Sequence, residues 1–268
     1  MNRIKVLAAL VKSMGLLAIF LMVVVILSLE AAAPDAGAKK GVIPFEESRI
    51  IIEFNSTAQD VGIQVFLDGE AWKEVQIVGP DGKISEVKGK GNVKNIGLTE
   101  LFFEGDEPSL EDLPLEDFLA LFPEGEYQFS GKGVEGEDLA GTATFTHIIP
   151  CGPEIVSPEE GAEVDPNNIV IRWNAVTHKV NLETGECDEE SEIDIVGYQV
   201  TVEREDPLRT FSVDLPASVT RVRVPRTFLE PGTEFKIEVL AIEAGRNQTI
   251  TESFFCTDPL TPCPAPEP

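Results

Sequence analysis

The sequence is poor in the side chains that most enzymes and metalloproteins use. Among 268 residues there are only 2 histidines, 2 tyrosines, 2 tryptophans and 3 methionines. His147 and His178 stand outside the G-x-S-x-G and H-E-x-x-H patterns of hydrolases and zinc proteases. The glycine-rich segment 88–92 lacks the third glycine of a dinucleotide fingerprint and the Lys-Ser/Thr pair of a phosphate loop, and it is typical of a hairpin turn. We therefore expect a protein that is not an enzyme.

Basic residues are also scarce, with 21 Lys and Arg against 47 Asp and Glu, which gives a formal net charge of -26. Such a charge repels nucleic acids and anionic lipid surfaces, so we expect no nucleic-acid partner. Hydrophobic residues still make up 43% of the chain, enough for packed cores, and the acidity therefore indicates a solvated surface. The length suits two domains of roughly 100 to 150 residues each.

The first 38 residues have the layout of a signal peptide. Basic residues precede an apolar run from Gly15 to Leu29, and small residues at positions 36–38 suit cleavage after Ala38. The alternative is an uncleaved anchor, because the apolar stretch approaches about 20 residues if positions 6–10 contribute. We expect export to the periplasm, the cell surface or the extracellular space, with no stable membrane contact unless the leader stays attached.

The four cysteines fit an exported chain. They are Cys151, Cys187, Cys256 and Cys263. An even number in an exported protein indicates disulfides, and three pairings are possible. No C-x-x-C is present and the histidines are not at zinc-finger intervals, so we expect no metal cluster.

Short segments rich in Val and Ile, separated by turn signals, predict antiparallel β-structure in both halves. The predicted strands are 48–54, 61–67, 71–78, 83–88, 126–133, 141–150, 168–173, 195–203, 210–215, 220–224, 234–242 and 248–255. One helix is expected within 109–122, where Ser109 and Asp112 form a capping-type start and apolar residues recur at helical spacing. A stiff Pro-Cys-Gly-Pro segment at 150–153 separates the two halves.

The second half resembles a fibronectin type III domain over residues 153–256. The resemblance is carried by Trp173 on the second strand, by the Gly-Tyr-Gln-Val run at 197–200 and by the Leu-x-Pro-Gly-Thr-x-Phe corner at 229–235. It implies a β-sandwich and, in general terms, an interaction module. Phe235 stands where the family usually has tyrosine, so we expect packing alone to hold this corner.

The first half repeats that corner. Leu121, Pro123 and Tyr127 align with Leu229, Pro231 and Phe235 at an offset of 108 residues (229 minus 121), and here the tyrosine is present. The alternative is chance, because Pro and Gly before a strand are common turn chemistry. We expect an all-β fold of two β-sandwich domains: an immunoglobulin-like sandwich with one short helix at 45–150, a fibronectin type III domain at 153–256, and a Pro-rich tail at 257–268.

The resemblance also selects one disulfide pairing. In a fibronectin type III arrangement the first strand begins at the same pole as the loop between the second and third strands. This implies that Cys151 pairs with Cys187. Cys256 ends the last strand at the opposite pole, which implies a local bridge to Cys263.

A long acidic insertion, residues 177–195, is the candidate binding loop. Its candidate side chains are Glu186, Asp188, Glu189, Glu190, Glu192 and Asp194. Three interpretations stay open: a solvated charged loop, a contact for a basic partner, or a calcium site. Since the calcium-loop signature D-x-[DN]-x-[DN]-G is absent, we expect no cofactor and keep calcium as the alternative.

These patterns predict an exported, non-catalytic interaction or structural protein that presents β-sandwich modules to an extracytoplasmic protein. The first alternative is a glycan-binding or small-molecule-binding protein, with Trp72 as its surface aromatic because Trp173 is expected in a core. The second is a hydrolase with paired carboxylates. Asn55 and Asn247 each begin a glycosylation sequon.

Overall fold

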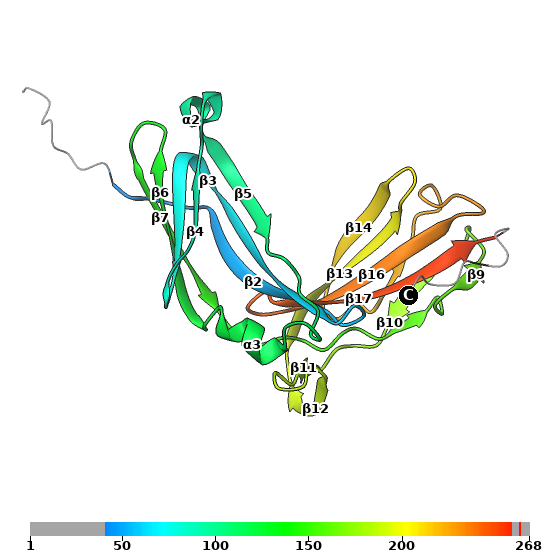
Figure 1. The fold of residues 1–268 in the computed structure, drawn as a ribbon. Coiled ribbons are helices and arrows are strands. Elements are labelled where there is room, and N and C mark those ends of the chain that lie inside the picture. Colours follow the sequence, from blue (N-terminus) through cyan, green and yellow to red (C-terminus); the bar gives the residue numbers. More distant parts are fainter. Residues whose placement is uncertain (1–40, 259–262, 264–268) are drawn as a thin grey trace, which may run out of the picture. The chain divides into compact units, whose positions relative to one another are not determined.

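The computed structural model describes residues 41–258 and Cys263. The predicted leader and almost all of the predicted Pro-rich tail lie outside these residues. Residues 42–258 form one compact unit. Its helices, α2 (Asn92–Ile96) and α3 (Leu115–Ala120), have neither the length nor the apolar composition of a membrane-spanning helix. The prediction of an all-β fold is confirmed (Figure 1).

We call residues 43–149 the N-terminal lobe. Its strands are β1 (Ile43–Pro44), β2 (Glu47–Asn55), β3 (Asp60–Gly79), β4 (Gly82–Lys88), β5 (Leu98–Glu104), β6 (Gly125–Gly133) and β7 (Asp138–Phe145). The two strands predicted at 61–67 and 71–78 form the single 20-residue strand β3. The first part of β3 pairs with β2 and β5, and the second part pairs with β4 and β6, so backbone hydrogen bonds carry the strand through the expected turn.

The core of the N-terminal lobe is aromatic and aliphatic, and Phe54, Phe129 and Phe145 are among its fully buried side chains. Tyr127 is buried with them, and its hydroxyl donates a hydrogen bond to the Pro123 carbonyl at 3.0 Å. This bond ties the strand to the turn before it, as a tyrosine corner does in a sandwich. Helix α3 covers the same core with three buried residues on one face.

Three predicted details of this lobe are wrong. Ser109 and Asp112 do not start the helix: α3 begins after Pro114, and the Ser109 hydroxyl accepts the Asp112 N–H at 3.2 Å in a separate turn before it. Segment 88–92 leads into α2 instead of forming a hairpin turn, since β4 and β5 both pair with β3 and not with each other. His147 lies beyond the end of β7. Strand β5 was not predicted.

We call residues 150–258 the C-terminal lobe. Its strands are β8 (Ile155–Ser157), β9 (Ala162–Val164), β10 (Val170–Trp173), β11 (His178–Val180), β12 (Cys187–Glu192), β13 (Ile195–Arg204), β14 (Arg209–Pro216), β15 (Arg221–Arg223), β16 (Glu234–Glu243) and β17 (Gln248–Thr257). One sheet has the order β15-β10-β8, and the other contains β14-β13-β16-β17. Trp173, Tyr198, Phe235 and Phe255 are buried in one apolar cluster of this lobe. This is the fibronectin type III-like arrangement that the resemblance implies.

The expectation that packing alone holds the Phe235 corner is wrong. Phe235 does stack on Phe255, with 5.4 Å between ring centroids. The hydrogen bond that a tyrosine would provide is replaced by the buried Thr257, whose hydroxyl donates to the Glu230 carbonyl at 2.5 Å and accepts the Thr233 N–H at 2.9 Å. A threonine from the last strand therefore fastens the corner.

The structure pairs the cysteines as the resemblance implies. Cys151 is bonded to Cys187 with 5.3 Å between their Cα atoms, and Cys256 is bonded to Cys263 with 5.7 Å. The first bridge joins the start of the C-terminal lobe to strand β12. The second joins the end of β17 to the segment that follows it.

Thr257→Val tests the corner, because valine keeps the shape and removes the hydroxyl. We expect the free energy of unfolding to fall by about 1 to 3 kcal/mol, since the part-buried Thr233 N–H and Glu230 carbonyl lose their partner. Urea unfolding followed by tryptophan fluorescence measures this change. Thr99→Val, at an exposed position of β5, is the matched control. Equal stability of the two variants would show that packing holds the corner.

Candidate binding groove at the junction of the two lobes

Strands β2 and β17 join the lobes. They pair in parallel, with Gln248 opposite Glu53 and Ile250 opposite Asn55. The pairing connects the two lobes into one sheet of order β1-β7-β6-β3-β2-β17-β16-β13-β14 (Figure 1). The paired strands are about 195 positions apart, as in the Ile52–Asn247 hydrogen bond, so no local pattern in the sequence indicates this contact.

Asn247 is the centre of this junction, with 1% of its surface exposed. Its side-chain oxygen accepts the Ile52 N–H at 2.9 Å. Its side-chain nitrogen donates to the carbonyls of Thr146 and Ile148, both at 2.9 Å. All of these partners belong to the N-terminal lobe. A glycan cannot be attached at Asn247 in this fold, because the amide nitrogen is buried and bonded.

The acidic insertion is a β-hairpin with a buried inner side. Val180 of β11 is buried in the N-terminal core, and its N–H donates to the Ile149 carbonyl at 2.8 Å. The Cys151–Cys187 disulfide fixes the opposite strand. The insertion therefore fastens the C-terminal lobe to the N-terminal core.

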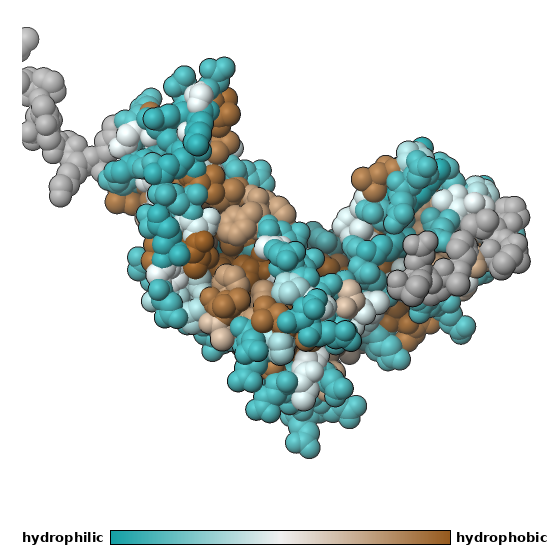
Figure 2. Space-filling model, in the orientation of Figure 1, coloured by the Kyte–Doolittle hydropathy of each residue, from teal (hydrophilic) through white to brown (hydrophobic). Residues whose placement is uncertain are grey.

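The candidate acidic side chains lie on the outer side of this hairpin, which Figure 2 shows as hydrophilic. Five are exposed: Glu186, Glu189, Glu190, Glu192 and Asp194. The Asp188 carboxylate accepts bonds from the Ser191 hydroxyl and the Glu190 N–H, and these bonds lower its pKa. In the described chain no three of these carboxylates lie within 4.8 Å of one another. The carboxylates of the described hairpin are thus spread out, and calcium binding stays an alternative.

The glycan-binding alternative loses its aromatic residue. Trp72 is 0% exposed and belongs to the N-terminal core, so it cannot stack on a sugar. Its place in the middle of β3, between two sets of partner strands, explains the burial. Trp173 is buried in the C-terminal core, as expected.

Both histidines make contacts that support the fold. The His147 ring nitrogen Nε2 bonds the Phe122 carbonyl at 2.8 Å, and its ring meets Phe145 edge-on. His178 lies in β11, where its carbonyl accepts the Cys151 N–H at 2.9 Å. Both residues support the chain near the start of the C-terminal lobe.

One carboxylate cluster lies at the junction, and no sequence pattern predicts it. The acidic groups of Glu53, Glu104 and Glu107 lie within 4.8 Å of one another. Burial raises the pKa of Glu53 to about 7, the bond from Gln248 opposes this shift, and the charges of Glu104 and Glu107 add to it.

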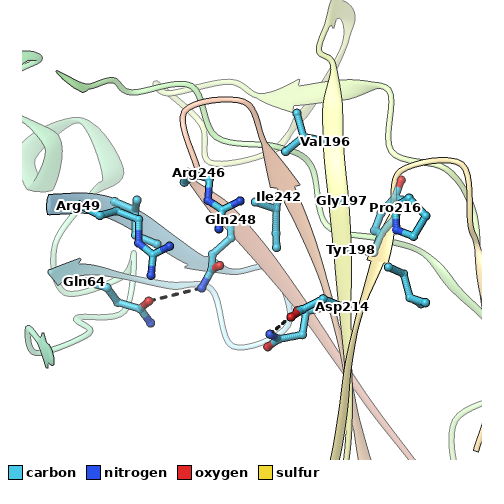
Figure 3. A pocket seen from close by; sticks show the side chains of 13 residues that line it. Arg49, Gln64, Val196, Gly197, Tyr198, Asp214, Pro216, Ile242, Arg246 and Gln248 are labelled. Atoms are coloured by element: carbon cyan, nitrogen blue, oxygen red, sulfur yellow. Dashed lines mark hydrogen bonds between the residues drawn. The ribbon is translucent and has the colours of Figure 1, made fainter. Parts of the chain in front are cut away.

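An open groove of about 640 Å³ lies on the joined sheet (Figure 3). Residues of β2, β3, β13, β14, β16 and β17 line it. The strand register explains the hollow: Gln248 is opposite Ile242, Ile242 is opposite Gly197, and Gly197 is opposite Pro216. Since Gly197 has no side chain, the surface of the sheet is hollowed between the side chains of Ile242 and Pro216.

The ionisable groups of the groove differ from the rest of the protein. Arg49 and Arg246 face Asp214, so the lining is net positive on a chain of charge -26. Asp214 accepts a hydrogen bond from Gln199 at 2.8 Å. Arg49 contacts Glu47 at 3.1 Å and lies over the Phe66 ring at 5.2 Å. Sequence reasoning missed both arginines, because they come from opposite ends of the described chain.

No protein-family model matches the chain, and no curated protein matches it. Among solved structures the chain is similar to a segment of two fibronectin type III domains from chicken tenascin, with 11% identity over 78% of this chain and 97% of that chain. It is also similar to the fn3 domain of the human collagen alpha-1(XX) chain, with 18% identity over 44% and 89%. A third similarity is to the spore cortex lytic enzyme SleM of Clostridium perfringens, with 21% identity over 40% and 28%. Each TM-score is 0.27. The description of the C-terminal lobe therefore rests on its own strand order.

Asn247→Ala tests the junction. We expect the free energy of unfolding to fall by about 3 kcal/mol or more, because the Ile52 N–H and two carbonyls are left buried without partners. Urea unfolding measures the loss, and faster hydrogen exchange of the Ile52 amide locates it. Asn95→Ala, at an exposed position, is the control. A loss below about 1 kcal/mol would contradict the role given to Asn247.

Glu53→Gln tests the carboxylate cluster. The folded-state pKa of Glu53 lies above its ordinary value of 4.5, so the folded protein holds a proton that the unfolded chain releases. Glu53 therefore lowers stability as the pH rises from about 4.5 to 7. We expect the free energy of unfolding of the variant to rise relative to that of the wild type across this window, by on the order of 2 kcal/mol at pH 8. Unfolding curves at a series of pH values measure this, with the exposed Glu100→Gln as control.

Proposed function

We propose that the protein is an exported, non-catalytic interaction or structural protein that presents its β-sandwich lobes to a protein partner outside the cytoplasm. The fibronectin type III-like sandwich fits such a role in general terms. Two disulfides are compatible with an oxidising compartment. The large negative charge keeps an exported chain soluble and disfavours non-specific binding to polyanions.

The observation that carries this proposal is the joined sheet. Domains within one chain move relative to each other by default, unless a large or well-bonded interface holds them. Here a β2–β17 pairing, the Asn247 amide and the anchored hairpin all connect the lobes. Such connections preorganise a wide surface and so reduce the entropy cost of binding.

A capture experiment tests the proposal. The full chain is immobilised and exposed to the extracytoplasmic fraction of its own source, with and without millimolar calcium. We expect one protein to be retained specifically, in a stoichiometric amount and in both conditions. Retention of no protein by the folded chain would overturn the proposal, and retention only with calcium would restore the metal alternative.

The acidic hairpin stays a predicted contact and has its own variant. Replacing Asp188, Glu189 and Glu190 with Ser should leave folding unchanged and reduce capture of a partner with a basic surface. Replacing Glu111, Glu116 and Asp117 with Ser removes the same charge near α3 and is the matched control. Equal capture by both variants would remove the hairpin from the contact and leave the proposal of a protein partner intact.

A further inference from the structure

We propose that the groove on the joined sheet binds an acidic, extended peptide segment of a partner protein, with Arg49 and Arg246 holding its carboxylates. This inference rests on the proposed function and names the ligand class for one surface. Both lobes build the groove: Arg49 and Gln64 come from the N-terminal lobe, and Arg246 and Asp214 from the C-terminal lobe.

The two guanidinium groups have most of their hydrogen-bonding capacity left. An arginine side chain carries five N–H donors. Arg246 has no ion pair or side-chain hydrogen bond with any part of the chain that the structure describes. Arg49 has one contact, with a single oxygen of Glu47. Both side chains reach the groove from the same side in Figure 3, with Asp214 and Pro216 on the other side.

The negative charge of the whole protein does not prevent this recognition. At physiological ionic strength charges more than about 8 Å apart are largely screened, so the nearest groups decide. Asp214 is bonded to Gln199, and the buried Glu243 is bonded to the N–H groups of Gly245 and Asn247. Glu47 contacts Arg49 through one oxygen only, and Arg246 has no ion pair with the described residues, so both arginines retain N–H donors for a ligand carboxylate.

Arg49 is also held in place. It is opposite Phe66 on β3, and Phe66 is opposite Phe102 on β5. The ring of Phe66 supports the guanidinium group, and Phe102 is 57% exposed beside it. A guanidinium group with a fixed orientation loses less entropy when it binds a carboxylate. The neighbouring aromatic rings suit an apolar residue next to the acidic one.

A peptide fits this groove better than a small molecule does. Small-molecule sites are mostly apolar and enclose their ligand, whereas this groove is open and largely polar. Strand β14 forms one border through Asp214, Leu215 and Pro216. The groove crosses neighbouring strands from β3 and β2 to β14, so an extended segment laid along it contacts groups of both lobes.

Fluorescence anisotropy with the full chain tests the inference. The probe is a fluorescein-labelled peptide of alternating Glu and Val at physiological ionic strength, and the Gln-Val peptide is its uncharged counterpart. We expect the Glu-Val peptide to bind at least about tenfold more tightly, because hydrogen bonds to a charged acceptor are stronger than those to a neutral one. Arg49→Gln and Arg246→Gln should each weaken binding by about tenfold as well.

Matched variants separate recognition from folding. Arg221→Gln removes the same charge from an exposed position of β15, on the other sheet, and should leave binding unchanged. Arg49→Lys keeps the charge should Arg49→Gln fail to fold, and it should weaken binding less than loss of the charge does. Thermal unfolding of every variant verifies the fold.

Three outcomes would overturn the inference. The first is equal binding, or no binding, of the Glu-Val and Gln-Val peptides. The second is binding of glutarate as tight as that of the Glu-Val peptide and with the same dependence on Arg49 and Arg246, which would make the groove a small-anion site. The third is full retention of the captured partner by the Arg49→Gln/Arg246→Gln double variant. That result would leave the proposed function standing, whereas failure of the wild type to retain any partner would remove the proposed function itself.

Discussion

The buried amide of Asn247 is the interaction on which the molecule depends. A primary amide taken out of water must have its oxygen and both N–H groups satisfied, and an unsatisfied buried group costs about 1 to 3 kcal/mol. Asn247 finds these partners in Ile52, Thr146 and Ile148. Since all of them belong to the other lobe, the C-terminal lobe satisfies this residue only when the two lobes are joined.

The acidic insertion reinforces the same junction, so its acidic composition does not make it a loop without structural role. Its outer side carries exposed carboxylates, while its inner side places Val180 in the N-terminal core. The disulfide ties the other strand of the hairpin, at Cys187, to Cys151 at the start of the C-terminal lobe. The segment is therefore both strongly acidic and structural, because its carboxylates are exposed while Val180 is buried and Cys187 is bridged.

Local patterns predict most of the strands, because each strand needs apolar residues on alternate positions to face its core. Predictions from local patterns fail where tertiary contacts determine whether a strand continues or a side chain is buried. Asp68-Gly69-Glu70 has the composition of a turn, yet β3 continues through it because partner strands lie on both sides. Trp72 and Asn247 have no local feature that distinguishes burial from exposure. The groove was not predictable either, since its arginines meet only through the β2–β17 pairing.

One tight turn links the junction to the groove. Between β16 and β17 the backbone at Arg246 has φ 79°, a left-handed conformation that usually favours glycine or asparagine. The buried Glu243 carboxylate accepts the N–H groups of Gly245 and Asn247, and the Glu243 carbonyl accepts the Arg246 N–H, so the turn is held from inside. This turn places Asn247 against the N-terminal lobe and the neighbouring Arg246 in the groove lining. A change in the turn would therefore disturb both together, so the contact that joins the lobes also sets the position of the groove's unpaired arginine.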